Sequence, residues 1–183
     1  KLPEQEVNRI VERLFSSFVD PIHRSQGDIN ETAGDGLMII FKEDDIKTNA
    51  VNSIKAAFDI HQQSLACNRK LPSHVDPLKV NMGIHCGTAL LGMTRFKGSI
   101  DTRMTYTASG NVTNLAARLA GHARGGDILI AEETQKLIDG LWPVFDKGTA
   151  VLKGIEKPVH VYSILRAARP GSAQPRQTVN AVQ

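Results

Sequence analysis

A continuous apolar run from Leu37 to Phe41 places the strongest constraint on how this chain folds. The run directly follows Gly34, Asp35 and Gly36, a combination typical of a tight turn between antiparallel strands. A strand that is apolar on both faces is normally covered on both faces. We therefore expect a hairpin that begins near Asp28, with its second strand buried between other layers of structure.

Helical and extended patterns alternate along the rest of the chain. Apolar residues recur at intervals of three and four, which predicts amphipathic helices over residues 3–24, 46–67 and 111–123. Extended segments are expected on either side of Gly87. Further strands are predicted at 127–132, 145–154 and 159–165, with a short helix at 132–141 and a polar loop at 95–103. Helices packed on a sheet, as in α+β and α/β domains, follow from this alternation.

Length and periodicity indicate one domain over residues 1–166, followed by a flexible tail over 167–183. The formal net charge is +3, but Arg169 and Arg176 lie in the tail, so the domain itself is close to neutral. Such a balance gives no support to nucleic-acid binding. An RNA-binding sheet would also need exposed aromatic side chains, and the chain has only one Trp, two Tyr and six Phe.

The cysteine content and the hydropathy indicate a cytoplasmic protein. Cys67 and Cys86 form no CxxC motif, so a zinc site or a redox pair is not expected. The longest apolar run is far shorter than the roughly 20 residues that cross a bilayer, so we expect no membrane contact by this part of the chain. His85 and Cys86 are interpreted as packing residues, because they lack partners at metal-ligand spacing.

Two sets of polar residues are candidates for chemistry. Asp35, at the tip of the turn, could hold a hard cation such as Mg²⁺, or it could simply belong to a hairpin loop. Asn111, Asn114 and Arg118 share one face of the helix predicted at 111–123. That face could bind a ribose and a phosphate, or it could be an ordinary solvated face.

Four segments, taken together, resemble the catalytic domains of class III adenylate and guanylate cyclases of the bacterial type. NETAGDGLMIIF is similar to their second metal motif, and GIHCGTALLG to their central hairpin. TYTASGNVTNLAARLA resembles their N-x-A-A-R helix, and LKGIEKPVHVYSI their closing segment. The four occur in the family's order across about nine-tenths of the chain.

The resemblance implies a ferredoxin-like βαββαβ core and a head-to-tail homodimer with active sites at the interface. Asp35 would bind metal, as one ligand of two Mg²⁺ or Mn²⁺ ions. Asn114 would orient the ribose and Arg118 would stabilise charge on the α-phosphate, both acting from the opposite protomer. Lys153 would contact the terminal phosphates, with Arg103 as a weaker phosphate candidate. The implied substrate is ATP or GTP, and a fused sensor or regulatory domain is expected.

The base-reading positions leave ATP and GTP open. Glu31 resembles guanylate cyclases, in which a carboxylate accepts hydrogen bonds from guanine. Thr107, which follows Tyr106, resembles bacterial adenylate cyclases instead.

Family members begin with a strand that bears the first metal aspartate, and these 183 residues lack that strand. We expect it upstream, because the strand is central to the sheet and its loss would leave backbone groups unpaired. An alternative function follows if the aspartate is truly missing, namely a catalytically inactive cyclase-like module that binds nucleotide or dimerises.

Overall fold

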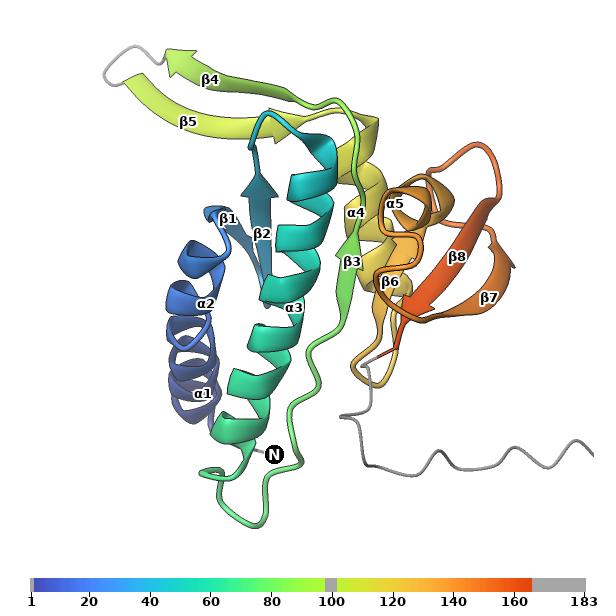
Figure 1. The fold of residues 1–183 in the computed structure, drawn as a ribbon. Helices are drawn as coiled ribbons and strands as arrows, with labels where there is room; N and C mark the ends of the chain where they lie inside the picture. Colours follow the sequence, from blue (N-terminus) through green and yellow to red (C-terminus); the bar gives the residue numbers. More distant parts are fainter. Residues whose placement is uncertain (1, 98–101, 166–183) are drawn as a thin grey trace, which may run out of the picture.

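The computed structural model describes residues 2–97 and 102–165 (Figure 1). Its elements, in order, are α1 (Glu4–Ser16), α2 (Val19–Arg24), β1 (Gly27–Ala33), β2 (Gly36–Phe41), α3 (Ile46–Asn68), β3 (Met82–Ile84), β4 (Leu90–Lys97), β5 (Thr102–Ser109), α4 (Asn111–His122), β6 (Ile128–Ala131), α5 (Glu132–Leu137), β7 (Val144–Ala150) and β8 (Val159–Ile164). The tail predicted at 167–183 lies outside the described residues.

The first predicted helix is divided into two at Ser17 and Phe18. Pro21 explains the break, because its ring has no N–H and collides with the carbonyl four residues earlier in a continuous helix. The Ser17 side chain donates to the Leu14 carbonyl at 2.6 Å, which closes the last turn of α1. Phe18 and Ile22 remain on one apolar face and are both buried.

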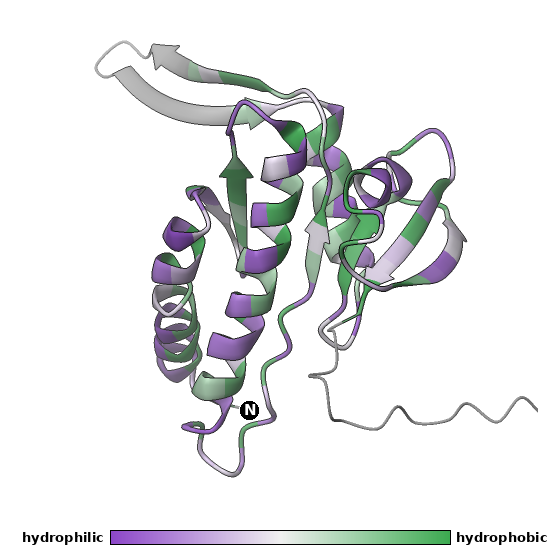
Figure 2. Cartoon of the chain, in the orientation of Figure 1, coloured by the Kyte–Doolittle hydropathy of each residue, from purple (hydrophilic) through white to green (hydrophobic). Residues whose placement is uncertain are grey.

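The predicted hairpin is present, but β2 is less buried than its composition suggested. β1 and β2 pair in antiparallel register, with Ala33 opposite Gly36 and the turn between them. All six residues of β2 are half-buried, although Figure 2 shows the strand hydrophobic along its length. The expectation of full coverage was wrong: among the described elements α3 contacts β2 and β1 pairs with it, and the strand stays only half-buried.

Helix α3 begins at a strong cap and connects the parts of the core. The Asp45 carboxylate accepts from the backbone N–H groups of Lys47 and Thr48, at 3.2 and 2.9 Å. Hydrogen bonds from the Thr48 hydroxyl and backbone lower the pKa of Asp45, as expected of an N-cap carboxylate. Further along, Ala50 and Ile54 pack with β6, whereas Ile60 packs with α1 and α2.

The larger sheet has the strand order β3-β6-β8-β7, with β3 and β6 parallel and the other pairs antiparallel. Helix α4 packs on β3 and β6. The order from α1 and α2 through β1, β2 and α3 to β3 matches the ferredoxin-like pattern after its first strand. Within the described residues β2 and β3 belong to separate sheets.

The β4–β5 hairpin extends away from the body of the molecule (Figure 1). Pairing runs from Leu90 opposite Ser109 to Lys97 opposite Thr102. The polar loop predicted at 95–103 is therefore shorter than expected, since both strands continue into it. Leu90 and Met93 are exposed on this hairpin, at 75% and 58%.

Candidate active site

Helix α4 presents the predicted polar face to solvent. Leu119 is fully buried, with Leu115 packed beside it, while Asn111, Asn114 and Arg118 are exposed. Gly110 precedes the helix at a φ of +134°, and the Thr113 hydroxyl donates to its carbonyl at 2.9 Å. The amide and the guanidinium therefore project from a rigid element whose opposite side is anchored in the core.

A short loop between β7 and β8 presents Lys153 next to this helix. Leu152 is buried in the same apolar cluster as Leu119, which anchors the loop against α4. A turn follows, in which the Ile155 N–H donates to the Leu152 carbonyl at 3.0 Å and Gly154 has a φ of +77°. Lys153 lies between the buried leucine and this turn and is exposed.

Arg118 and Lys153 line one cavity of about 210 Å³. The rest of its wall comprises Ala117, Gly121, His122, Val151 and Leu152. None of these lining residues is acidic, so two permanent cations face a space without a neutralising carboxylate. Such a cavity favours an anion, and a phosphate chain is the anion that paired Arg and Lys side chains commonly bind.

The β1–β2 hairpin holds Asp35 and Glu31, and neither residue lines the cavity. Asp35 is exposed beside Gly34, whose φ is +60°. Glu31 is exposed just after an irregularity in the β1–β2 register. Its neighbour Asn30 keeps both side-chain polar atoms buried without a hydrogen-bond partner, a feature that the sequence did not reveal.

A divalent cation finds one suitable donor at this hairpin. The Asp35 carboxylate is an accessible oxygen ligand of the kind that Mg²⁺ and Mn²⁺ prefer. Within residues 2–97 and 102–165, however, no three His, Cys, Asp or Glu side chains lie close enough to share an ion. Asp35 therefore fits as a single ligand and does not form a complete site.

Two of the predicted substrate residues lie on β5. The Thr107 backbone pairs opposite Gly92 and that of Arg103 opposite Phe96. Their side chains lie outside the described part of the structure. β1 and β5 are in contact, so the strands that bear Glu31 and Thr107 meet, although they belong to separate sheets.

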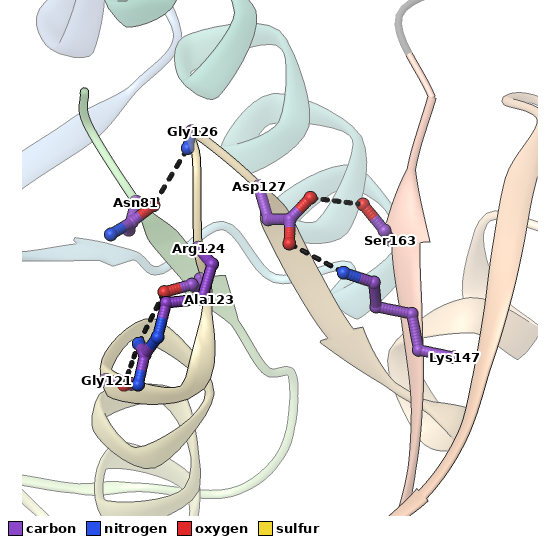
Figure 3. Close-up of polar contacts among 8 residues, drawn as sticks. All are labelled: Asn81, Gly121, Ala123, Arg124, Gly126, Asp127, Lys147 and Ser163. Atoms are coloured by element: carbon purple, nitrogen blue, oxygen red, sulfur yellow. Dashed lines mark hydrogen bonds and ion pairs between the residues drawn. The ribbon is translucent and has the colours of Figure 1, made fainter.

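The connection between α4 and β6 is held by a series of polar contacts (Figure 3). The Arg124 guanidinium donates to the carbonyls of Gly121 and Ala123, each at 2.7 Å. The Gly126 N–H donates to the Asn81 side chain at 2.9 Å. Asp127 accepts from Lys147 on β7 and Ser163 on β8, at 2.7 and 3.3 Å. The end of α4 is therefore fixed relative to three strands of the sheet.

His85 and Cys86 are packing residues, as interpreted from the sequence. Burial lowers the pKa of His85, against the opposing charge of Glu133, and its Nδ1 atom is buried without a partner. Burial raises the pKa of the Cys86 thiol, although a hydrogen bond with Thr134 partly offsets this. A protonated, buried thiol is a poor nucleophile and a poor metal ligand.

Comparison with known proteins decides the family. The model of the adenylate and guanylate cyclase catalytic domain matches residues 2–166. The chain belongs to this family. The four motifs are therefore parts of one cyclase catalytic domain, and the ferredoxin-like α+β fold expected from them is confirmed.

Individual relatives agree with this assignment. Adenylate cyclase 1 of Rhizobium meliloti is 24% identical over 90% of this chain, and the terminal-differentiation-specific adenylate cyclase of Dictyostelium discoideum is 27% identical over 85%. The chain spans only 25% and 7% of their respective lengths. In the described residues, no helix has the length and apolar character required to span a membrane.

Solved cyclase structures share the fold. The adenylyl cyclase CyaB from P. aeruginosa has a TM-score of 0.80 and 27% identity, covering 92% of this chain and 87% of that one. The guanylyl cyclase Cya2 has a TM-score of 0.71 and 22% identity, covering 93% and 85%. Cyclases of this family depend on metal ions, and both adenylyl and guanylyl enzymes occur among the neighbours.

Proposed function

We propose that this chain is a catalytic domain that converts a nucleoside triphosphate to a 3′,5′-cyclic nucleotide and pyrophosphate. The ribose 3′-oxygen attacks the α-phosphorus and loses its proton, and the bond from that phosphorus to the β-phosphate oxygen breaks. The observation that supports this best is the cavity shared by Arg118 and Lys153, which lie on different elements. The inactive module gains no support from relatives that are named as cyclases.

Each side chain has a role suited to its position on the chain. Arg118 stabilises the charge that develops on the α-phosphate, and Lys153 binds the terminal phosphates from the same cavity. Asn114 lies one turn before Arg118 on the exposed face of α4 and orients the ribose. Such a reaction depends on positioning and charge stabilisation more than on covalent help. Arg103 is an additional phosphate candidate on β5.

Metal binding is part of the proposal. Asp35 would hold Mg²⁺ or Mn²⁺, two ions in all, which would neutralise phosphate charge and acidify the 3′-hydroxyl. Glu31 and Thr107 read the base from the contacting strands β1 and β5. Because a carboxylate favours guanine whereas threonine suits either base, ATP and GTP are both proposed substrates. A signalling role and a fused regulatory domain are proposed because the relatives are much longer than this chain.

The first test is a cyclase assay on the full-length protein, with ATP and GTP supplied separately and the products resolved by chromatography. Arg118→Ala is expected to lower kcat about 30- to 1000-fold, the effect of losing roughly 2–4 kcal/mol of preorganised charge stabilisation. Arg69→Ala removes an exposed arginine that does not line the cavity and serves as the matched control.

Two results would contradict the proposal. One is the absence of cyclic product from either nucleotide when the protein is folded and metal is supplied. The other is an Arg118→Ala variant that turns over as fast as Arg69→Ala, which would remove Arg118 from the mechanism.

A further inference from the structure

We propose that His122 is a third ligand of the phosphate chain, binding the same terminal phosphates as Lys153 and, after bond cleavage, the pyrophosphate product. This inference rests on the proposed function, because it assigns the cavity between α4 and the β7–β8 loop to the polyphosphate. No motif identified in the sequence includes His122.

Position supports the assignment. His122 follows Arg118 by four residues, so the two side chains lie one above the other on the same side of α4. Both line the cavity, and Lys153 lines it from the β7–β8 loop. An imidazole N–H donates a hydrogen bond in either protonation state and adds a positive charge when protonated. A phosphate chain in this cavity would therefore meet donors from two elements.

The local electrostatics favour an anion despite the helix end. The C-terminus of a helix is normally negative, because its last carbonyls have no partner, and it would repel phosphate. Here the Arg124 guanidinium donates to the carbonyls of Gly121 and Ala123, both at 2.7 Å (Figure 3). The carbonyls next to His122 are thus neutralised by a cation, and no carboxylate lines the cavity.

The cavity is also large enough for a phosphate group, and polar contacts hold the end of α4 beside it in place. Its volume of about 210 Å³ is several times the ~30 Å³ that a water molecule occupies in the liquid. Gly121 contributes no side chain to the wall, and a Cβ atom added there would meet nothing within 4 Å. The contacts of Asn81 and Asp127 hold the segment that follows His122 against the sheet. The imidazole is therefore presented from a stable helix end.

Direct binding of inorganic pyrophosphate to the full-length protein, measured by calorimetry, tests the proposal. His122→Ala is expected to weaken the affinity roughly 3- to 10-fold, the effect of losing one hydrogen bond at an exposed site. His122→Lys should restore it, because an ammonium replaces the donor and the charge. His74→Ala, at an exposed loop residue outside the cavity, is the matched control.

Each outcome separates the two proposals. Weaker pyrophosphate binding in His122→Ala with rescue in His122→Lys supports the ligand role, even if no cyclase activity is found. If His122→Ala binds pyrophosphate as tightly as the wild type, the ligand role is overturned. If the wild-type protein also shows cyclase activity, the proposed function is left standing. A lower melting temperature without a change in affinity would mean that His122 only stabilises the end of α4, and would also overturn it.

Discussion

At the scale of single residues, Asp127 shows how one carboxylate holds together the strands that support the candidate site. Burial raises the pKa of this carboxyl, but the hydrogen bond and charge of Lys147, together with hydrogen bonds from the Arg124 backbone and the Ser163 hydroxyl, outweigh burial and lower it. A lowered folded pKa means that the contact stabilises the protein above the unfolded value of about 3.9. That stabilisation is lost as the pH falls through the lower, folded value.

We therefore expect Asp127→Asn to reduce the free energy of unfolding by about 1 kcal/mol at neutral pH, after allowance for the partial exposure of Lys147. The difference from wild type should disappear at acid pH, where the wild-type carboxyl is also neutral. Urea denaturation at about pH 7 and at a series of lower pH values measures how the difference shrinks as the pH falls. Asp76→Asn, at an exposed residue of the segment between α3 and β3, is the control. An equal loss at every pH would show that charge is not the cause.

Candidate site residues could be identified from the sequence only where a motif contained them. Arg118 and Lys153 belong to recognisable segments, but their meeting in one cavity depends on how Leu152 and Leu119 pack, which is a tertiary fact. His122 belongs to no motif, and it is a candidate because the same packing places it at the cavity. Spacing along α4 does place it under Arg118, and that is the signal by which it could have been found.

At the scale of elements, the approach of α4 to β3 depends on Gly83. A Cβ atom added to Gly83 would collide with the backbone of Ala116, Leu119 and Ala120. The first glycine of the GIHCG segment is thus required for close packing, not for an unusual backbone angle, because its φ is not positive. Any side chain at this position would move the helix that bears Asn114 and Arg118.

Gly83→Ala is expected to destabilise the protein by about 1–3 kcal/mol, since the obstructing atoms are backbone and cannot rotate away. Thermal denaturation measures the loss, and activity should fall with it because α4 is displaced. Gly92→Ala is the matched control for stability, since a Cβ there meets nothing within 4 Å. Equal melting temperatures of the two variants would contradict the packing argument.

The positions of the helices and strands agree closely with those predicted from the spacing of apolar residues. The differences between prediction and structure have identifiable physical causes. The helix predicted at 3–24 divides at Ser17 and Phe18, because the effect of Pro21 on the preceding turn outweighs the apolar repeat. β4 and β5 continue into a segment that was predicted as loop, because cross-strand pairing tolerates polar residues on an exposed hairpin. The partial burial of β2 reflects its neighbours and not its own composition.

At the scale of the whole molecule, Asp35 and the Arg118–Lys153 cavity occupy different parts of one chain. We propose that the chain forms a homodimer in which Asp35 of one protomer lies at the cavity of the other; a two-fold axis would make this arrangement occur twice. The proposed active site then requires two copies of the chain, with half of the residues from each.

Mixing two inactive variants tests this arrangement. Asp35→Ala and Arg118→Ala should each lose cyclase activity alone, whereas an equal mixture should recover about one quarter of the wild-type value, because half of the dimers contain one intact site. Activity measured before and after mixing checks the expectation. No recovery in a mixture shown to exchange subunits would mean that both residues act within one chain.

The position of helix α3 has a consequence for how the domain unfolds. Its first half packs on β6 through Ala50 and Ile54, and its second half packs on α1 and α2 through Ile60. Opening of either region uncovers a different stretch of the same helix, so α3 couples their local unfolding. The backbone amides in each half of α3 should consequently exchange with solvent together with the region that this half contacts. Through its two halves, the helix links the stability of the hairpin that holds Asp35 to that of the sheet that supports the cavity.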